Sequence, residues 1–228
     1  MENVFIDYAI CAVPLQIGNF SANFGIFFGY LNAGVIDRID NTGTVLSGGF
    51  TPYDIILGAS FAKKIFGNLG VGGTVKGIYS DIAGISSASC AFDAGFTYGL
   101  LQDSLKVGAS VQNLGFPMKF SSQQDSLPLT IRVGASYKLK SLLVSLDSVI
   151  PNDGNLTLHF GAEYGIKIMY GIDGLLRIGY NGKNALTGGL AGFSLGGGIQ
   201  GNVYTIDYAW VPYGIVGSTH RLSMGLKF

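Results

Sequence analysis

Apolar and polar residues alternate along almost the whole chain, with the two-residue period of a β-strand. Within residues 87–100, for example, Phe92 and Phe96 share one phase, whereas Ser89 and Asp93 share the other. The same alternation predicts about thirteen strands, and no segment shows the period of a helix. The predicted strands cover residues 3–13, 20–31, 53–65, 69–80, 87–100, 104–113, 128–139, 142–150, 156–168, 173–181, 188–199, 202–211 and 218–228.

The length and number of these strands decide which phase faces solvent. Soluble sheets have strands of about 5 to 6 residues, whereas many of these strands are about twice as long. A closed barrel of about eight strands is filled by its own side chains, but a barrel of thirteen or more keeps a wide lumen. The polar phase would line that lumen and the apolar phase would face lipid. The sequence therefore predicts an all-β, antiparallel up-and-down transmembrane β-barrel, with a two-layer soluble sandwich as the alternative.

A set of charged residues within the strands falls on the polar phase, so we expect these side chains to line the channel. Symmetry about the hairpin turns pairs Glu163 with Arg177, Asp207 with Arg221, and Arg132 with Asp147 across neighbouring strands. The candidate lumen residues are Asp93, Lys106, Arg132, Asp147, His159, Glu163, Arg177, Asp207 and Arg221.

Aromatic residues of the apolar phase are expected to point away from the barrel axis, since such rings gather at the bilayer interfaces. Burial of most of them in a closed core would contradict the membrane interpretation. The rings in question are Phe20, Phe24, Phe28, Phe92, Phe96, Tyr98, Tyr204, Tyr208 and Trp210.

Composition and charge narrow the function. Of the 228 residues, 36 are Gly and only 12% are charged, against about 25% in an average globular protein. No apolar run approaches the roughly 18 residues of a membrane helix. Because the net charge is zero and the cations are scattered, nucleic acid is not an expected partner. Cys11 and Cys90 are expected to face opposite ways, as two small unpaired side chains.

The lengths of the connections predict the orientation of the chain in the membrane. Short and long connections alternate, and outer-membrane barrels keep short turns in the periplasm and longer loops outside. The last strand is then predicted to end in the periplasm. The first strand of the sequence is predicted to run toward the periplasm as well. We therefore expect residues 1–228 to form a single barrel domain with thirteen of fourteen strands, lacking an amino-terminal segment, the first strand and a signal peptide.

Three matches to catalytic or ligand-binding patterns are weak. Gly192–Gly196 fits the G-x-S-x-G pattern around Ser194, but no helix is predicted after it, which leaves a hydrolase as a remote alternative. Residues 196–201 fit G-x-G-x-x-G, yet another strand follows where a dinucleotide site needs a helix. His159 and Glu163 lie on the same face of one predicted strand, with one residue of that face between them. No further metal ligand is clustered with them. We therefore expect no enzyme activity, no cofactor and no metal.

The carboxy terminus carries the most informative motif. Its last strand ends on an aromatic residue, like the assembly signal of bacterial outer-membrane barrels, with Met224, Gly225, Leu226 and Phe228 as its residues. Residues 105–120, 127–139 and especially 206–228, with the run DYA…PYG…G-x-THR, resemble the PorV/PorQ family of the FadL-like group of outer-membrane barrels.

That resemblance implies a fourteen-stranded barrel in the bacterial outer membrane. FadL-like relatives pass hydrophobic compounds, and PorV-type members serve a protein secretion system. The implied partners are outer-membrane lipid, the barrel assembly machinery, and either hydrophobic small molecules or secreted proteins with secretion-system components. A structural barrel or diffusion pore is the remaining alternative.

Overall fold

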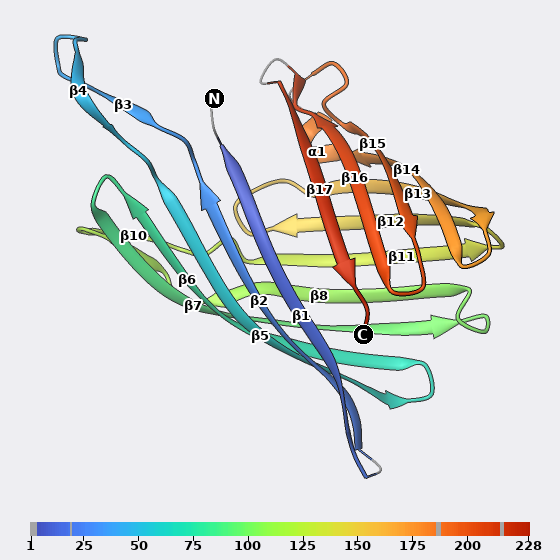
Figure 1. Cartoon of the computed structure of the whole chain (residues 1–228). Coiled ribbons are helices and arrows are strands. Elements are labelled where there is room, and N and C mark those ends of the chain that lie inside the picture. The colour runs from blue at the N-terminus through green and yellow to red at the C-terminus, as the bar shows by residue number, and fades with distance from the viewer. Residues whose placement is uncertain (1–3, 19, 186–187, 215–216) are drawn as a thin grey trace. The chain divides into compact units, whose positions relative to one another are not determined.

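The computed structural model describes residues 4–18, 20–185, 188–214 and 217–228. Thirteen strands form one antiparallel sheet in which each strand pairs with the next one of the sheet along the chain (Figure 1). No helix of the described residues is long and apolar enough to cross a membrane. The sheet strands are β1 (Phe5–Ile17), β2 (Phe20–Asn32), β5 (Tyr53–Phe66), β6 (Leu69–Ile82), β7 (Ile85–Leu100), β8 (Leu105–Gly115), β11 (Thr130–Leu139), β12 (Leu142–Pro151), β13 (Thr157–Met169), β14 (Ile172–Asn181), β15 (Phe193–Gln200), β16 (Tyr204–Pro212) and β17 (Ser218–Leu226).

The predicted strands and the observed ones agree closely, because period-two alternation is a strong signal over ten or more residues. The sequence analysis missed two short hairpins inside predicted loops, β3 (Ile36–Ile39) with β4 (Val45–Phe50), and β9 (Met118–Phe120) with β10 (Gln123–Asp125). It also began the strand at 188–199 too early. Glycines at 188 and 189 adopt positive φ there, and β15 starts at Phe193, after the short helix α1 (Gly182–Ala185).

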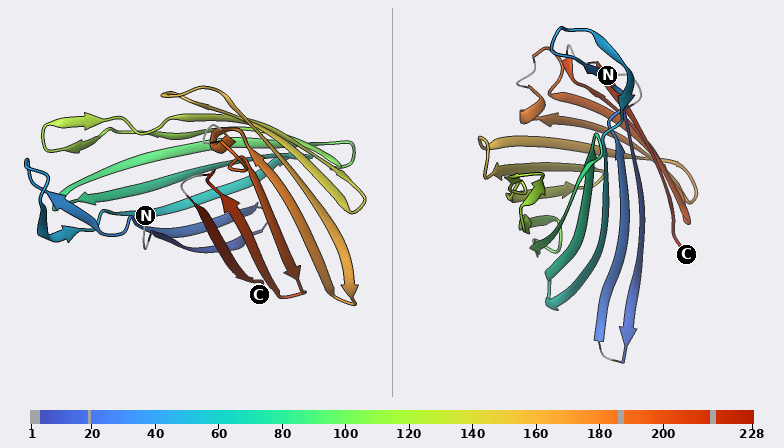
Figure 2. Two further views of the ribbon diagram at one scale, coloured as in Figure 1. Left: turned by 90° about the horizontal axis from the view of Figure 1, so that it is seen from above. Right: turned by 90° about the vertical axis from the view of Figure 1, so that its left-hand side faces the viewer.

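The chain divides into two compact units. Unit 1 comprises Met1–Phe96 and Ser110–Thr130, and it holds β1, β2, β5, β6, most of β7, the last part of β8, and both short hairpins. Unit 2 comprises Thr97–Ala109 and Ile131–Phe228, and it holds β11 to β17 with the remaining ends of β7 and β8. Within each unit the strands follow one another in sequence order, as the two further views of Figure 2 show.

The β3–β4 hairpin lies in the long connection between β2 and β5, as drawn in light blue in Figures 1 and 2. Its tip is closed by Asp40, whose carboxylate accepts hydrogen bonds from the backbone of Thr42 and Thr44. The hydrogen bond from the Thr42 hydroxyl, together with these backbone donors, lowers the pKa of Asp40 below its usual value. The tip of the longest connection is therefore an ordered turn.

The described residues contain no large side chain that is fully buried. The few buried apolar residues are mostly small, and three of them, Ala91, Met118 and Leu127, form one cluster. A soluble sandwich of this size would bury its Phe, Leu and Ile side chains between two sheets. Here many of those side chains are instead exposed, as the membrane interpretation requires.

Candidate functional site

The sheet has two chemically different faces. We call the face that carries Phe24 and Phe96 the aromatic face, and the opposite one, which carries Asp93 and Glu163, the charged face. Eight of the nine aromatic side chains predicted to point outward are 37–48% exposed, and the ninth, Trp210, is half-buried. None of them is packed into a closed core, so the result that would have contradicted the membrane interpretation does not occur.

Two rows of aromatic rings cross the aromatic face of unit 1. Near the end of the strands that carries the long loops, the rings of Phe5, Tyr30, Tyr53 and Tyr79 follow one another on four adjacent strands, with centroids 6.0–6.2 Å apart. Near the end with the short turns, Phe20 stacks on Phe61 at 6.3 Å. The rows resemble the two aromatic girdles that flank the apolar band of a membrane barrel.

The spacing of the two rows fits a bilayer. Phe20 and Tyr30 lie ten residues apart on β2, which is about 33 Å along a strand that rises about 3.3 Å per residue. A strand tilted by about 40° then spans about 25 Å along the bilayer normal, the height of the apolar band in outer-membrane barrels. Lys63, with Nζ 4.1 Å from the centroid of the Phe20 ring, lies at the border of this band, where a long cationic side chain can reach water.

On the charged face of unit 2, Arg177 connects two carboxylates across four strands. Its Nε donates to Oε2 of Glu163 at 2.7 Å, and its Nη1 donates to Oδ1 of Asp207 at 2.5 Å. Glu163 and Arg177 are register partners on β13 and β14, as predicted. Asp207 is on β16, so the guanidinium must reach over the intervening strand β15.

Glycines on β15 make this reach possible. Gly196 is the register partner of Arg177, and Gly198 is the register partner of Asp207. A Cβ atom at Gly198 would overlap the Asp207 carboxylate and come within 3.2 Å of Arg177 Nη1. The glycine-rich segment that matches a dinucleotide pattern therefore has a local role, which is to leave room for an ion pair above the strand.

A second ion pair of unit 2 joins Arg132 on β11 to Asp147 on β12, as predicted. His159 is the register partner of Asp147, and its Nε2 lies 3.0 Å from the hydroxyl of Thr157.

The predicted pairing of Asp207 with Arg221 is wrong. The hairpin of β16 and β17 is symmetric about residue 215 rather than 214, so Arg221 lies opposite Ala209, and Asp207 lies opposite Ser223. Arg221 Nη2 instead donates to the hydroxyl of Tyr213 at 3.1 Å.

On the charged face of unit 1, Lys76 of β6 forms an ion pair with Asp93 of β7. The atoms Nζ and Oδ2 are 2.7 Å apart, and the side chains are 9% and 23% exposed. The other carboxylate oxygen of Asp93 accepts the backbone N–H of Asn113 at 2.7 Å. The sequence analysis did not select Lys76, although its position opposite the phase of Val75 and Tyr79 was a usable signal.

An apolar band also crosses the charged face of unit 1, which alternation alone did not reveal. Tyr8 of β1, Gly29 of β2, Ile56 of β5 and Ile78 of β6 are successive register partners. The side chains of Tyr8 and Ile56 close over Gly29, since a Cβ there would lie 2.6 Å from each of them. In the adjacent row the ring of Phe27 lies over Gly58 in the same way.

The band continues under the β9–β10 hairpin. Ile78 packs against the cluster of Ala91, Met118 and Leu127. The hairpin is held there by polar contacts with β7: the Ser87 hydroxyl accepts the N–H of Lys119 at 2.8 Å, and the Ser89 hydroxyl donates to the carbonyl of Phe116 at 2.5 Å. The charged face of unit 1 thus offers a continuous apolar surface from β1 to β7.

The remaining predicted residues occupy simple surroundings. Lys106 is exposed on β8 and forms no ion pair with a described carboxylate. Met224, Leu226 and Phe228 of the predicted assembly signal are 73–97% exposed, and Gly225 lies between the first two on the other face of the strand. The role of the charged residues as channel lining, and that of the carboxy-terminal residues in assembly, stay predictions.

The structure gives the weak motifs a structural context. Ser194 lies inside strand β15, not on a strand-to-helix turn, and residues 196–201 lead from β15 toward β16. Among the described residues no group of His, Cys, Asp and Glu could hold a metal ion. Cys11 and Cys90 are both free, and the prediction that they face opposite ways is wrong, because each shares a phase with exposed apolar residues of the aromatic face.

Comparison with known proteins bears on the fold. No family model and no curated protein matches this chain. Among solved structures, the crystal structure of the Pseudomonas putida toluene transporter TodX matches with a TM-score of 0.58 over 97% of this chain and 85% of that one, at 10% sequence identity. TodX is a FadL-family outer-membrane transporter. The fold is that of a FadL-like β-barrel. The predicted fold class, an antiparallel up-and-down β-barrel, is confirmed.

Proposed function

We propose that this chain is a bacterial outer-membrane barrel through which hydrophobic compounds pass. The observation that carries the proposal is the apolar band on the charged face of unit 1, from Tyr8 through Ile56 and Ile78 to the cluster at Ala91. A pore for polar solutes has no use for such a surface, whereas an apolar solute needs one that replaces water. The likeness of the fold to TodX supports the same function.

The exposed aromatic face supports the membrane location. It offers two aromatic rows about 25 Å apart along the bilayer normal, with apolar residues between them. The ion pairs Arg132–Asp147 and Glu163–Arg177–Asp207 would line a hydrated part of the lumen, since their side chains are 25–44% exposed.

The test measures entry of a radiolabelled neutral aromatic hydrocarbon into bacterial cells that carry the chain in their outer membrane. Ile56→Asn with Ile78→Asn interrupts the apolar band, and we expect the protein-dependent uptake rate to fall at least about fivefold because the apolar solute must then pass two polar amides. Ser136→Asn with Ser223→Asn introduces the same two amides on the charged face of unit 2 and should leave uptake unchanged. Equal uptake by the parent and the Ile56/Ile78 variant would contradict the proposal.

The resemblance of residues 105–120, 127–139 and 206–228 to the PorV/PorQ family favours a second candidate, the handling of secreted proteins at the outer membrane. The two functions separate in cells from which the gene is deleted. Loss of proteins from the cell surface, with hydrocarbon entry unchanged, would favour secretion. A diffusion pore would instead admit small hydrophilic sugars at a rate that the Ile56/Ile78 variant does not change.

A further inference from the structure

The turn end of unit 2 carries an unusual excess of positive charge. We use the name turn end for the strand ends of unit 2 that are joined by the short turns after β7, β11, β13 and β15. The neighbouring end of β17, where the N–H of Lys227 donates to the carbonyl of Val203, belongs to it too. Two aspartates, Asp103 and Asp173, lie at this end. The five lysines there are Lys106, Lys138, Lys140, Lys167 and Lys227.

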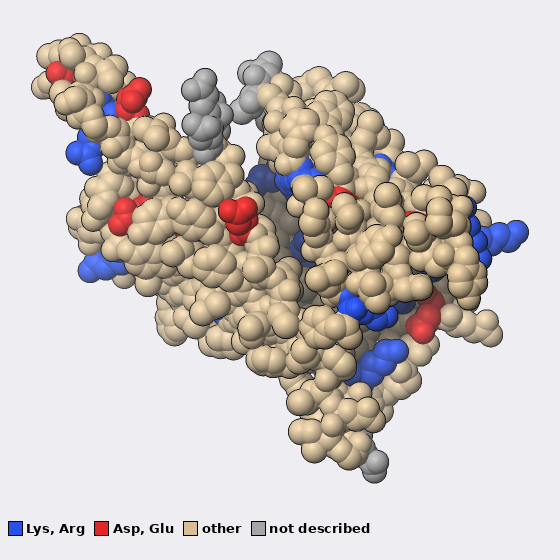
Figure 3. Space-filling view, viewed as in Figure 1, with Lys and Arg blue, Asp and Glu red and all other residues tan. Residues whose placement is uncertain are grey.

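None of the five lysines forms an ion pair with a described carboxylate, although Lys167 is the register partner of Asp173. All five are exposed, and the ion pairs of the described residues involve only Lys76, Arg132 and Arg177. The central part of the same strands is different, because there each of the two arginines faces one or two carboxylates. In Figure 3 blue atoms accordingly reach the right-hand border, where the turns of β11 to β14 lie in Figure 1.

The lysines are too widely spread to enclose a small anion. Lys106 on β8 and Lys227 after β17 are separated by seven strand spacings in the sheet order, or about 34 Å at roughly 4.8 Å each. A small anion is bound by donors that converge within hydrogen-bond distance, whereas a row of this length suits an extended polyanion.

Their orientation argues against lipid headgroups as that polyanion. Lys138 and Lys167 share a phase with Arg132 and Glu163, so they lie on the charged face, opposite the face that would contact the bilayer. The backbone N–H of Lys138 donates to Ser104, which places Lys106 on the same part of the sheet.

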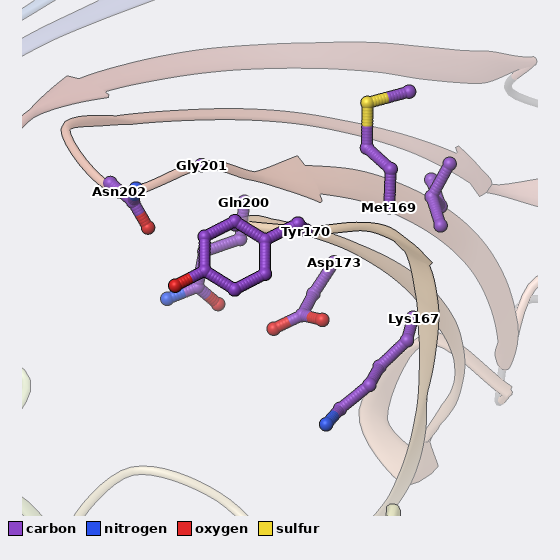
Figure 4. Close-up of a pocket in the computed structure, with 9 residues that line it drawn as sticks. Lys167, Met169, Tyr170, Asp173, Gln200, Gly201 and Asn202 are labelled. Atoms are coloured by element: carbon purple, nitrogen blue, oxygen red, sulfur yellow. The ribbon is translucent and has the colours of Figure 1, made fainter.

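A cavity at this end provides groups that recognise polypeptide. It has a volume of about 700 Å³ and lies between the β13–β14 and β15–β16 turns (Figure 4). Gln200 and Asn202 offer amides that can pair with a peptide backbone, next to Lys167 and Asp173. Tyr170 is fully exposed at the rim, as an aromatic anchor for a partner would be.

We infer that the turn end of unit 2 is a docking surface for an acidic polypeptide segment, which Lys138, Lys140, Lys167 and Lys227 attract and the cavity beside Tyr170 holds. The charges steer the segment, and the amides and the tyrosine ring give contacts that a uniform basic surface lacks. This inference does not depend on the proposed transport of hydrophobic compounds.

The experiment uses the full chain in nanodiscs of zwitterionic lipid and a fluorescein-labelled deca-glutamate peptide, with binding followed by fluorescence anisotropy. We expect saturable binding that weakens with rising salt, and a loss of at least about tenfold in affinity for Lys138→Gln/Lys140→Gln/Lys167→Gln/Lys227→Gln. Tyr170→Ser should weaken binding severalfold with no change of charge. The matched control, Arg38→Gln/Lys64→Gln/Lys119→Gln/Lys183→Gln, removes four cations elsewhere and should bind like the parent.

Heat-modifiable mobility on gels verifies that each variant is folded, and the pairs Lys138→Gln/Lys140→Gln and Lys167→Gln/Lys227→Gln replace the quadruple variant if it is not. Equal affinity of the parent and the lysine variants, or an equal loss in the control, would overturn the inference. So would lysine-dependent binding of phosphatidylglycerol vesicles without binding of the peptide, which would assign the lysines to lipid headgroups.

Discussion

Individual glycines decide which charges meet on the charged face. Arg177 reaches Asp207 only because β15 presents Gly196 and Gly198 beneath the guanidinium. Elsewhere Gly29 and Gly58 let Tyr8, Ile56 and Phe27 close over the backbone and make an apolar surface. Glycine therefore leaves space on the charged face of both units. Charged side chains fill that space in unit 2, and apolar side chains fill it in unit 1.

Gly198→Ala should break the contact between Arg177 and Asp207 and lower the free energy of unfolding by about 1 to 2 kcal/mol, because the added Cβ displaces the Asp207 carboxylate from a half-exposed charged hydrogen bond. Gly197→Ala is the matched control: its Cβ would point to the other face, with its closest neighbour at 3.7 Å. Denaturant unfolding followed by the fluorescence of Trp210, the only tryptophan, measures both. Equal losses in the two variants would show that the Arg177–Asp207 contact contributes nothing.

Residue-level predictions from the sequence succeeded where the two partners lie on strands joined by a short turn. Glu163–Arg177 and Arg132–Asp147 follow from symmetry about short, regular turns. The Asp207–Arg221 prediction failed because the register of β16 and β17 places Ser223, two residues from Arg221, opposite Asp207, and loop geometry does not show in alternation. The bond from Arg177 to Asp207 spans a third strand, so it could be found only once the sheet order and the absence of a side chain at Gly198 were known.

At the scale of the elements, strand length and aromatic placement together specify how a strand crosses the bilayer. The strands were predictable because each is long and alternates with few errors, whereas β3, β4, β9 and β10 were not, since three to six residues carry too little pattern. The apolar band escaped prediction for another reason: Ile56, Ile78 and Phe27 lie on the phase that alternation assigns to polar residues. Departures from the local pattern are expected at functional sites.

The loss in the free energy of unfolding that a charge on the aromatic face causes should depend on how deep in the bilayer its position on β2 lies. Ile26→Lys places a cation between the two aromatic rows and should lower the free energy of unfolding from lipid vesicles by about 2 to 4 kcal/mol. Tyr30→Lys lies in the aromatic row near the long loops and should cost only about 0 to 1 kcal/mol. Equal costs at the two positions would mean that the rows do not mark the borders of the apolar band.

At the scale of the whole molecule, charge is segregated by strand end although the net charge is zero. The loop end of unit 1 carries six aspartates against Arg38 and Lys119, and the turn end of unit 2 carries five lysines against Asp103 and Asp173. The six aspartates are Asp7, Asp37, Asp40, Asp54, Asp81 and Asp125. Acidic residues thus gather at the loop end of unit 1, and basic residues gather at the turn end of unit 2, so the orientation of each unit in the membrane decides which aqueous compartment meets which charge.

That orientation can be measured in intact cells. Short turns face the periplasm in outer-membrane barrels, so a cysteine at the turn position Tyr170 should be protected from a membrane-impermeant maleimide, and one at Thr42 in the β3–β4 tip should react. Both replacements, Tyr170→Cys and Thr42→Cys, are made in a Cys11→Ser/Cys90→Ser background, which removes the two native thiols. Permeabilising the outer membrane should expose residue 170. Labelling at residue 170 but not at residue 42 in intact cells would reverse the orientation and place the basic turn end of unit 2 outside the cell, where a periplasmic acidic partner could not reach it.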